Sequence, residues 1–359
     1  MILGFGEVMA RLATPEHRRW RQSMPGDIEV TWGGGEANVC VSLAMYGEAV
    51  RYLTALPRQP IAQALSDTMR GLGVDMSHVL WTEGGRLGLY FVEVGANQRG
   101  STVIYDRADS SVSLATPDQY DFAAVLDGVT HLHVSGITPA VSENAYLSNK
   151  ALIQAAREAG VRVSCDLNYR KKLWRWRPGT QPRDLARECM AEILPLIDIV
   201  IGNEEDASDV LDIHAADTDV TKGNINAAAY ADVARQIHSQ YSNVSYVAIT
   251  LRESISADRN RWGGLLFDVA ANESHLAPLN AAGEYEPYEV FDIVDRVGAG
   301  DSFAAGLIHS LQNSSAADAI RFAVAASCLK HSIRGDFNYV TREEVAALAG
   351  GNATGRVQR

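Results

Sequence analysis

Residues 293–306 read Ile293-Val294-Asp295-Arg296-Val297-Gly298-Ala299-Gly300-Asp301-Ser302-Phe303-Ala304-Ala305-Gly306. This stretch predicts the end of an apolar strand, a glycine turn and the first turn of a helix. The small residues at 298–300 allow backbone N–H groups to approach a charged ligand closely, and a helix leaves the N–H groups of its first turn unpaired. The stretch is therefore typical of an anion-binding turn.

Asp301 stands in the first turn of the predicted helix. A carboxylate at this position complements the helix dipole, which is a purely structural role. Beside a bound phosphate, the same carboxylate can accept the proton of an attacking hydroxyl. The residues alone leave both interpretations open.

Composition narrows the class of protein. The chain has 359 residues, of which 47% are hydrophobic and 21% charged, with a net charge of −12. This balance is typical of a globular protein, and the negative charge disfavours binding to nucleic acid or to an anionic membrane. We find no apolar run of about eighteen residues and no leader pattern, so we expect a soluble cytoplasmic protein. The four cysteines lie far apart and are expected to be buried thiols: Cys40, Cys165, Cys189 and Cys328.

The order of predicted elements indicates an α/β fold. Short apolar segments alternate with amphipathic segments from residue 130 onward, which favours a mostly parallel sheet with helices on both faces. Strands are predicted at 2–9, 51–55, 131–134, 161–166, 197–201 and 244–250, and helices at about 34–46, 61–72 and 142–158. In such a sheet, ligands bind at the carboxyl ends of the strands.

A second, smaller sheet is predicted from strands within 14–32 and 87–107. Its size suits a lid that keeps water from a reactive phosphate. We expect residues 1–349 to form one domain and 350–359 to be a frayed tail. The turn-rich segments 214–224 and 254–261 are predicted surface insertions.

Three further patterns have alternative interpretations. His131-x-His133 lies in a predicted buried strand, so core histidines are favoured over metal ligands. The run 170–177 is basic and contains tryptophans, as in single-strand nucleic-acid grooves. It is short and belongs to an acidic chain, so we expect Arg170 to point into a cleft and the later charges to be solvated. The Gly33-Gly34-Gly35 segment is either a loop that needs glycine dihedrals or part of a binding turn.

The motif at 295–303 resembles the C-terminal signature of the ribokinase-like (PfkB) sugar kinases. The segment 32–38 is similar to the N-terminal Gly-Gly signature of the same family. The resemblance implies a ribokinase-like fold, with a central mostly parallel sheet flanked by helices and a small β-sheet lid. It also implies that Asp301 is the catalytic base, that Gly298, Ala299 and Gly300 hold the transferring phosphoryl group, and that ATP and Mg²⁺ are required.

Segments 132–139, 166–174 and 335–338 resemble motifs of the 2-keto-3-deoxygluconate kinases within that family. The resemblance assigns substrate contacts to Gly34, Asn38, Tyr90, Tyr105, Arg107, Ile137, Arg170 and Asp336. A sugar acid carries a carboxylate that guanidinium groups can grip, which would give Arg107 and Arg170 a role. From the residues alone, both tyrosines could instead be ordinary strand packing, and Arg107 a solvated charge at the sheet edge.

The resemblance also assigns the residues that bind the nucleotide and the metal ions. It implies ATP contacts by Asn203, Thr250, Arg252, Gly298, Gly300 and Asn338, water-mediated magnesium contacts by Glu205 and Asp206, and a role for K⁺ at Asp295. Two positions depart from the family pattern. Asp206 replaces the glutamate of Asn-x-x-Glu, and Arg252 replaces the glycine of Thr-x-Gly, which leaves the phosphate donor open.

We therefore predict an enzyme that phosphorylates a primary hydroxyl of a sugar acid, with 2-keto-3-deoxygluconate and its O6 as the preferred choice. One alternative is a kinase of the same fold that acts on a neutral sugar such as fructose, or on a nucleoside. Another is a non-catalytic sugar-binding or regulatory protein. A homodimer that pairs through the lid sheet is expected.

Overall fold

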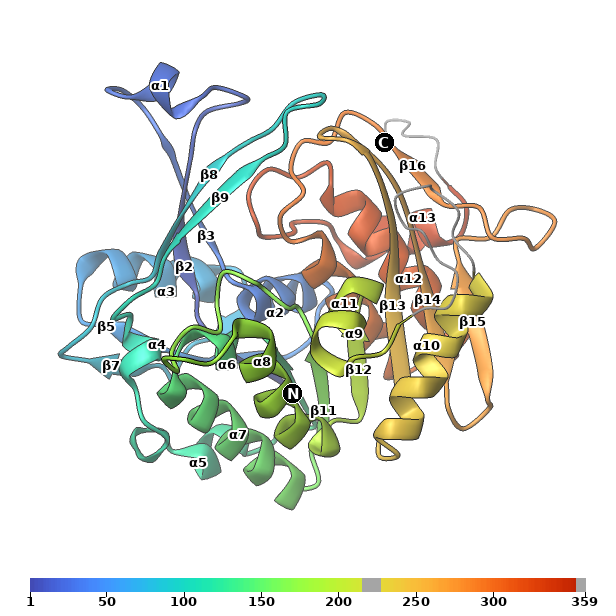
Figure 1. Ribbon diagram of the computed structural model, residues 1–359. Coiled ribbons are helices and arrows are strands. Elements are labelled where there is room, and N and C mark those ends of the chain that lie inside the picture. The colour runs from blue at the N-terminus through green and yellow to red at the C-terminus, as the bar shows by residue number, and fades with distance from the viewer. Residues whose placement is uncertain (215–226, 353–359) are drawn as a thin grey trace.

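Ten strands form the central sheet of the protein, whose computed structural model describes residues 1–214 and 227–352 (Figure 1). The strands of this sheet are β1 (Ile2–Phe5), β4 (Val50–Leu53), β6 (Val74–Asp75), β10 (His131–Ser135), β11 (Arg162–Asp166), β12 (Ile199–Gly202), β13 (Tyr246–Ser256), β14 (Arg259–Asp268), β15 (Glu273–Ala277) and β16 (Tyr288–Val290). Their order is β15-β14-β13-β12-β11-β10-β1-β4-β6, with β16 paired to β14.

The pairing from β6 to β13 is parallel, whereas β14 runs in the opposite direction and pairs antiparallel with β13, β15 and β16. The carboxyl ends of β1, β10, β11 and β12 therefore meet at one edge of the sheet. This confirms the predicted α/β class and the mostly parallel sheet.

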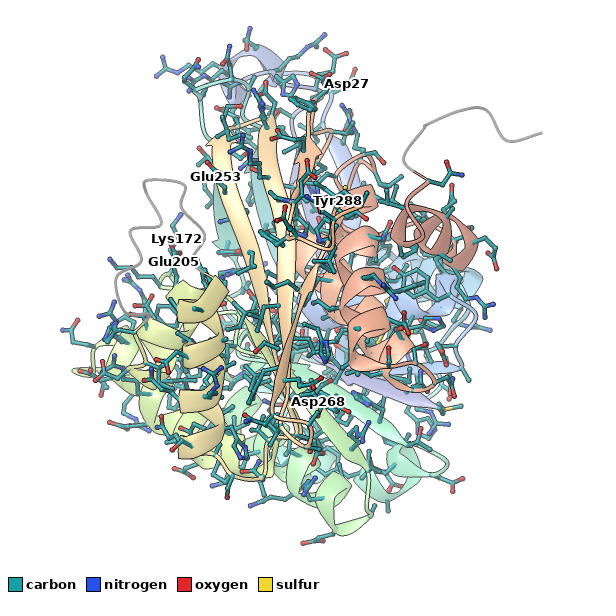
Figure 2. All side chains as sticks on the ribbon, turned by 90° about the vertical axis from the view of Figure 1, so that its right-hand side faces the viewer. Asp27, Lys172, Glu205, Glu253, Asp268 and Tyr288 are labelled. Atoms are coloured by element: carbon teal, nitrogen blue, oxygen red, sulfur yellow. The ribbon has the colours of Figure 1, made fainter. Side chains whose placement is uncertain are left out.

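Helices cover both faces of the sheet. The longer ones are α2 (Gly35–Met45), α3 (Pro60–Gly71), α7 (Glu143–Glu158), α8 (Pro182–Ile193), α9 (Glu204–Leu211), α10 (Ala227–Gln240), α11 (Ala299–Leu311), α12 (Ala316–Lys330) and α13 (Arg342–Ala349). Seen along the sheet edge, α10 packs on one side of β13 and β14 and α12 on the other (Figure 2). Successive residues of β1 enter the two opposite cores, Ile2 beneath α2 and Leu3 toward α7, as expected for a strand buried on both faces.

A separate four-stranded sheet stands above the carboxyl edge of the central sheet (Figure 1). Its order is β3-β2-β8-β9, formed by β2 (Met9–Ala13), β3 (Glu29–Gly33), β8 (Leu89–Glu93) and β9 (Thr102–Asp106). The register places Tyr90 opposite both Arg11 and Tyr105, so these three residues share one face. Leu12 lies opposite Val30 and Phe91 on the other face.

The remaining short elements connect the two sheets and the outer helices. They are α1 (Trp20–Ser23), β5 (Ala55–Pro57), β7 (Leu80–Thr82), α4 (Ser111–Leu114), η1 (Pro117–Gln119), α5 (Phe122–Leu126), α6 (Thr138–Val141) and η2 (Leu194–Leu196). No helix in the described part of the chain is long and apolar enough to cross a membrane.

Two predicted boundaries were wrong. The first strand ends at Phe5, not at Met9, because Met9–Ala13 crosses into the small sheet as β2. Residues 254–261 are not a surface insertion, since they form the turn and the ends of the long β13–β14 hairpin. The predicted insertion 214–224 falls almost entirely outside the described residues, and so does the tail from 353 onward.

The histidine pair is part of the core, as predicted. His131 and His133 are buried in β10, and both rings hydrogen-bond Ser164 Oγ on β11, at 2.8 and 2.9 Å. Burial lowers the pKa of both imidazoles to about 3, so they are neutral at pH 7.

Candidate active site

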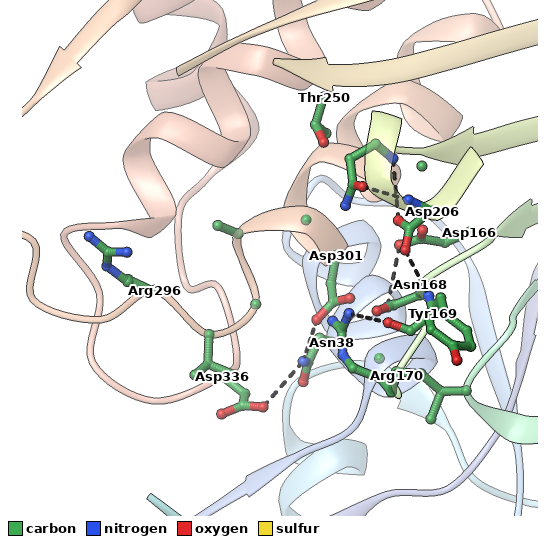
Figure 3. A pocket seen from close by; sticks show the side chains of 18 of the residues that line it. Asn38, Asp166, Asn168, Tyr169, Arg170, Asp206, Thr250, Arg296, Asp301 and Asp336 are labelled. Carbon is green, nitrogen blue, oxygen red and sulfur yellow. Dashed lines mark hydrogen bonds between the residues drawn. The ribbon is translucent and has the colours of Figure 1, made fainter. Parts of the chain in front are cut away.

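A cleft of about 830 Å³ lies at the carboxyl edge of the central sheet, between that sheet, the small sheet and the start of α11 (Figure 3). It brings together residues that are far apart in the sequence. The predicted site residues that line it are Gly34, Asn38, Tyr90, Tyr105, Arg107, Ile137, Arg170, Asn203, Glu205, Asp206, Thr250, Arg252, Gly298, Ala299, Gly300, Asp301 and Asp336.

The glycine turn forms the floor of the cleft and the N-terminus of α11. Gly298 caps the helix at φ 88°, a left-handed conformation that favours glycine. A Cβ at this position would lie 2.3 Å from the carbonyl oxygen of Asp336. At Gly300, in contrast, a Cβ would meet no protein atom within 4 Å, so this residue faces open space in the cleft. The turn thus presents unpaired backbone N–H groups to a ligand.

Asp301 is recessed beside this turn. Its Oδ2 accepts a hydrogen bond from Asn38 Nδ2 at 2.6 Å, and the same Asn38 amide lies 3.4 Å from Asp336 Oδ2 (Figure 3). The pKa of Asp301 is raised to about 7, chiefly because the carboxyl is buried; the hydrogen bond from Asn38 lowers the pKa, and the negative charge of Asp336 contributes to the rise. A carboxyl with such a pKa can accept a proton at neutral pH.

The start of α2 is fixed by contacts that only glycine permits. A Cβ on Gly33 would lie 2.2 Å from Asp336 Oδ2, and one on Gly34 would lie 2.2 Å from the carbonyl oxygen of Glu7. Gly34 has φ 171°, which is extended backbone, so close approach and not an unusual dihedral requires glycine here. One helical turn later, Asn38 Oδ1 accepts from the Gly34 N–H at 3.2 Å, which orients its amide toward Asp301.

The inner face of the small sheet forms one wall. Tyr90 and Tyr105 lie opposite each other in β8 and β9, with ring centroids 6.3 Å apart. Arg107, just after β9, is buried and pairs through Nε with Glu7 Oε2 at 2.5 Å. The arginine predicted to meet a substrate carboxylate therefore already has a countercharge, which the sequence did not reveal.

Arg170 follows β11 and reaches the cleft close to Asp301, as Figure 3 shows. Its Nη1 donates to the Tyr169 carbonyl at 3.1 Å. The rest of the basic run forms no groove, because Trp174 is buried and Trp176 donates from Nε1 to the Pro139 carbonyl while stacking on a core tyrosine.

The opposite end of the cleft carries Asn203, Thr250 and two arginines. Arg252 extends from β13, and Arg296 stands at the entry to the glycine turn. Burial lowers the pKa of the Arg296 guanidinium, and the positive charge of Arg252 lowers it further. The two cations therefore lie close enough to repel, and an anion bound between them would relieve this repulsion.

Asp206 and Glu205 have different surroundings. Asp206 is buried, and its oxygens accept from the backbone N–H groups of Tyr169 at 2.9 Å and Asn203 at 3.3 Å. Glu205 is exposed at the rim. Asp166 also faces the cleft, and burial together with the charges of Asp206 and Asp301 raises its pKa well above the ordinary value.

Two predicted site residues lie outside the cleft. Asn338 is fully buried and accepts from the Val340 N–H at 3.2 Å, so its side chain supports the C-terminal turn and does not line the cleft. Asp295 is also buried, and Arg11 Nη2 lies 2.7 Å from its Oδ2.

Sequence reasoning assigned no role to three residues that line the cleft, Glu7, Asp166 and Arg296, or to Arg11, which lies outside the cleft lining. Asp166 and Arg296 could have been found, because each lies within a segment already singled out. Arg11 and Glu7 could not, because both pair with residues at least 100 positions away, Glu7 with Arg107 and Arg11 with Asp336.

The comparisons with known proteins agree with this geometry. Residues 1–250 and 279–338 match the sequence profile described as pfkB family carbohydrate kinase. A 2-dehydro-3-deoxygalactonokinase from Haloferax volcanii is 30% identical over 354 residues, which cover 98% of each chain. The crystal structure of a 2-dehydro-3-deoxygluconokinase from Thermotoga maritima has a TM-score of 0.88 and 40% identity, and the match covers 98% of this chain and 99% of that one.

An Escherichia coli protein solved in complex with ATP and Mg²⁺ shares the fold, with a TM-score of 0.74 and 17% identity; the match covers 98% of this chain and 99% of that one. The ribokinase-like fold and the kinase class predicted from residues 293–306 are thus confirmed. This chain belongs to the pfkB family of carbohydrate kinases.

Proposed function

We propose that this kinase transfers the γ-phosphoryl group of ATP to the primary O6 hydroxyl of a six-carbon keto sugar acid, 2-keto-3-deoxygluconate or its galactonate epimer. One observation carries the proposal. The Asp301 carboxyl lies beside the open N-terminus of α11, in a cleft that also contains Arg107 and Arg170. The names of the relatives, which are kinases of these two sugar acids, support the substrate class.

The proposed reaction uses this geometry directly. Asp301 takes the proton from the sugar hydroxyl as the hydroxyl oxygen attacks the γ-phosphorus. The N–H groups at 298–300 stabilise the negative charge that spreads over the transferring oxygens, and α11 adds the positive end of its dipole. Because Gly300 leaves open space at this point, the phosphoryl group can approach the backbone closely.

The residues present fit a magnesium ion that is held mainly by phosphate and water. The described residues contain no group of three or more potential metal ligands, and Mg²⁺ in kinases commonly uses only one or two carboxylates. Glu205 and Asp166 are the carboxylates we assign to its hydration shell, because Asp206 is occupied by backbone N–H groups. The ion would neutralise charge on the phosphates.

On the nucleotide side, we assign Asn203, Thr250 and Arg252 to ATP and add Arg296. The mutual repulsion of the two arginines would end when phosphate binds between them. Arg252 therefore strengthens phosphate binding in this proposal, although a glycine is usual at its position.

On the sugar side, Asp336 and Asn38 would accept and donate hydrogen bonds to hydroxyls, and Tyr90 and Tyr105 would form the wall above the ring. Gly34 and Ile137 would shape the floor. Arg170 is an exposed cation of the cleft whose charge acts on Asp301, and it would bind the substrate carboxylate together with Arg107.

We further propose that the small sheet acts as a lid and as a dimer interface. Its outer face carries an apolar row across all four strands: Val30, Leu12, Phe91 and Ile104 are successive cross-strand neighbours. Val30 is 53% and Ile104 54% exposed. A second copy of the same sheet would cover this row, as the symmetry of homodimers requires of a self-complementary patch.

The test is a coupled assay of ADP release over a panel of sugar acids, neutral sugars and nucleosides. We expect the keto sugar acids to be the best substrates. Arg170→Met should reduce kcat/KM for acids by about 10- to 100-fold, as expected for loss of a charged contact worth about 1.5–3 kcal/mol. It should leave any residual activity on neutral sugars unchanged.

Arg175→Met serves as the matched control, because Arg175 belongs to the same basic run but is exposed outside the cleft. A neutral sugar or nucleoside that outperforms every acid would overturn the substrate assignment. No ADP release with any panel member would instead favour a non-catalytic binding protein.

A further inference from the structure

Two buried cations lie beneath the glycine turn. Arg11, on β2 of the small sheet, is 2% exposed, and Lys330, the last residue of α12, is fully buried. Charged side chains are rarely buried to this extent unless they are paired. Arg11 meets this condition through ion pairs with two carboxylates, and the Nζ of Lys330 donates to a backbone carbonyl.

Arg11 joins two aspartates. Its Nη2 lies 2.7 Å from Asp295 Oδ2, and its Nη1 donates to Asp336 Oδ1 at 2.9 Å. Asp295 also accepts from the backbone N–H of Val297 at 3.1 Å and of Gly335 at 3.1 Å. The guanidinium thus ties the entry of the glycine turn to the C-terminal loop that carries Asp336.

Lys330 lies on the other side of the same turn. Its Nζ donates to the Ile333 carbonyl at 2.9 Å, and its Cε would be only 3.1 Å from a Cβ on Gly298. Burial lowers the pKa of the Lys330 ammonium group, and the negative charges of Asp295 and Asp336 oppose this lowering.

These contacts use the oxygens that a bound K⁺ would need. Both oxygens of Asp295 accept protein hydrogen bonds, the Ile333 carbonyl accepts from Lys330, and the His331 carbonyl accepts from the N–H groups of Val294 and Asp295. The donor set around Asp295 therefore does not fit a monovalent cation.

We propose that Arg11 and Lys330 take the place of a bound monovalent cation, and that they position the glycine turn and Asp301. The connection to Asp301 is continuous: Arg11 holds Asp336, the Asn38 amide lies between Asp336 and Asp301, and Lys330 packs against Gly298. Turnover therefore does not depend on K⁺. This inference rests on the proposed kinase reaction.

The first test compares the wild-type enzyme in potassium-free buffer, with tetramethylammonium as the only cation besides Mg²⁺, and in KCl of equal ionic strength. We expect equal initial rates and equal melting temperatures. Because a ligand that binds the folded state raises the melting temperature, a K⁺-specific rise in stability or rate would overturn the proposal. The melting measurement needs no substrate, so it remains valid even if the sugar has been assigned wrongly.

The second test uses Lys330→Ala, which removes the ammonium group and leaves a small space. We expect a large loss of kcat that added K⁺, ammonium or methylammonium partly restores, with little change in KM for the sugar. A side chain with only a structural role would lower the melting temperature without any rescue.

Lys150→Ala is the matched control, because Lys150 forms a surface ion pair with Glu192 on the far side of the protein. It should have wild-type rates in every salt. Full activity of Lys330→Ala in potassium-free buffer would refute the positioning role. If Lys330→Ala does not fold, the wild-type salt comparison alone decides the question.

Discussion

The chemistry of Asp301 depends on its own helix and on neighbours from two distant segments. Asn38 donates to its carboxylate, Asp336 adds a second negative charge nearby, and the first turn of α11 holds it in place. These surroundings raise the pKa of the carboxyl to about 7. An exposed aspartate has a lower pKa and would be a much weaker base.

Replacing Asp301 with asparagine should separate binding from chemistry. The amide preserves the size of the side chain but cannot accept the hydroxyl proton, so we expect kcat to fall by about 10²- to 10⁴-fold. Sugar affinity, measured by isothermal titration calorimetry, should change little. Turnover like that of the wild type in this variant would exclude Asp301 as the base.

The pH dependence should report the same carboxyl. Since its pKa is raised to about 7 and only the deprotonated form accepts a proton, kcat/KM should rise with pH up to about 7 and then level off. Removing the hydrogen bond that stabilises the charged form, by Asn38→Ala, should move this rise to higher pH. A wild-type profile that is flat from pH 5 to 8 would contradict the assignment.

Substitution of Arg252 tests the proposed binding of ATP. We expect Arg252→Ala to raise KM for ATP by about tenfold, because a hydrogen bond to a charged group is worth about 1.5–3 kcal/mol and this one is exposed. KM for the sugar should stay the same. Arg259→Ala is the control, since Arg259 is a surface residue of the same hairpin that pairs with Glu289. A lower KM for ATP in Arg252→Ala would mean that this side chain obstructs the nucleotide.

Among the elements, the glycine turn that begins α11 has two glycines with different requirements. Gly298 needs its left-handed backbone and has no space for a Cβ, whereas Gly300 is helical and faces the open cleft. Substitutions at Gly298 and Gly300 can therefore separate effects on stability from effects on catalysis.

We expect Gly298→Ala to lower both the melting temperature and the activity, because left-handed backbone costs about 1–2 kcal/mol for a residue with a Cβ and the clash adds to this. Gly300→Ala should keep the wild-type melting temperature but lose most of its turnover, since the new methyl group fills the phosphoryl site. Thermal denaturation followed by circular dichroism, with parallel rate measurements, distinguishes the two. Full activity in Gly300→Ala would show that phosphate binds elsewhere.

Local patterns sufficed to predict the elements that carry the site. Glycines before Asp301 predicted the turn, and alternation in 87–107 predicted the strands that carry Tyr90 and Tyr105. Strand ends before Asn168 and Asn203 predicted the loops at the sheet edge. Each of these patterns involves residues only a few positions apart, so it can be recognised in the sequence alone.

Long-range pairing could not be predicted in this way. In the sequence, Arg11 is an ordinary polar residue within an apolar segment. No neighbouring residue indicates that it pairs with Asp336, which lies 325 residues further along. Asn338 fits a family motif, yet the fold buries it. Which residues pair or become buried in this way depends on how the two sheets pack together, and no local sequence pattern encodes that packing.

For the molecule as a whole, we propose that the small sheet serves both closure of the cleft and assembly. Its inner face presents tyrosines to the cleft, and its outer face presents the apolar row. Because side chains alternate along each strand, one sheet can serve both purposes without conflict.

Ile104→Glu should therefore convert the expected dimer to a monomer, because the buried row would then contain two unpaired carboxylates. Light scattering coupled to size-exclusion chromatography measures the mass. Leu147→Glu, on α7, is the control, since it alters another exposed apolar residue that lies outside the small sheet. A wild-type protein that is monomeric at micromolar concentration would refute the interface.

The ion pair between Glu7 and Arg107 has a consequence for how the enzyme releases its product. In the proposed reaction, an acidic sugar would share a guanidinium that Glu7 already neutralises, so it would be held less firmly than by a lone arginine. The phosphorylated product would be more anionic still and would face the same glutamate. We therefore expect repulsion to favour release of the ester, so that a single pair of side chains would limit the affinity for the reactant and speed the departure of the product.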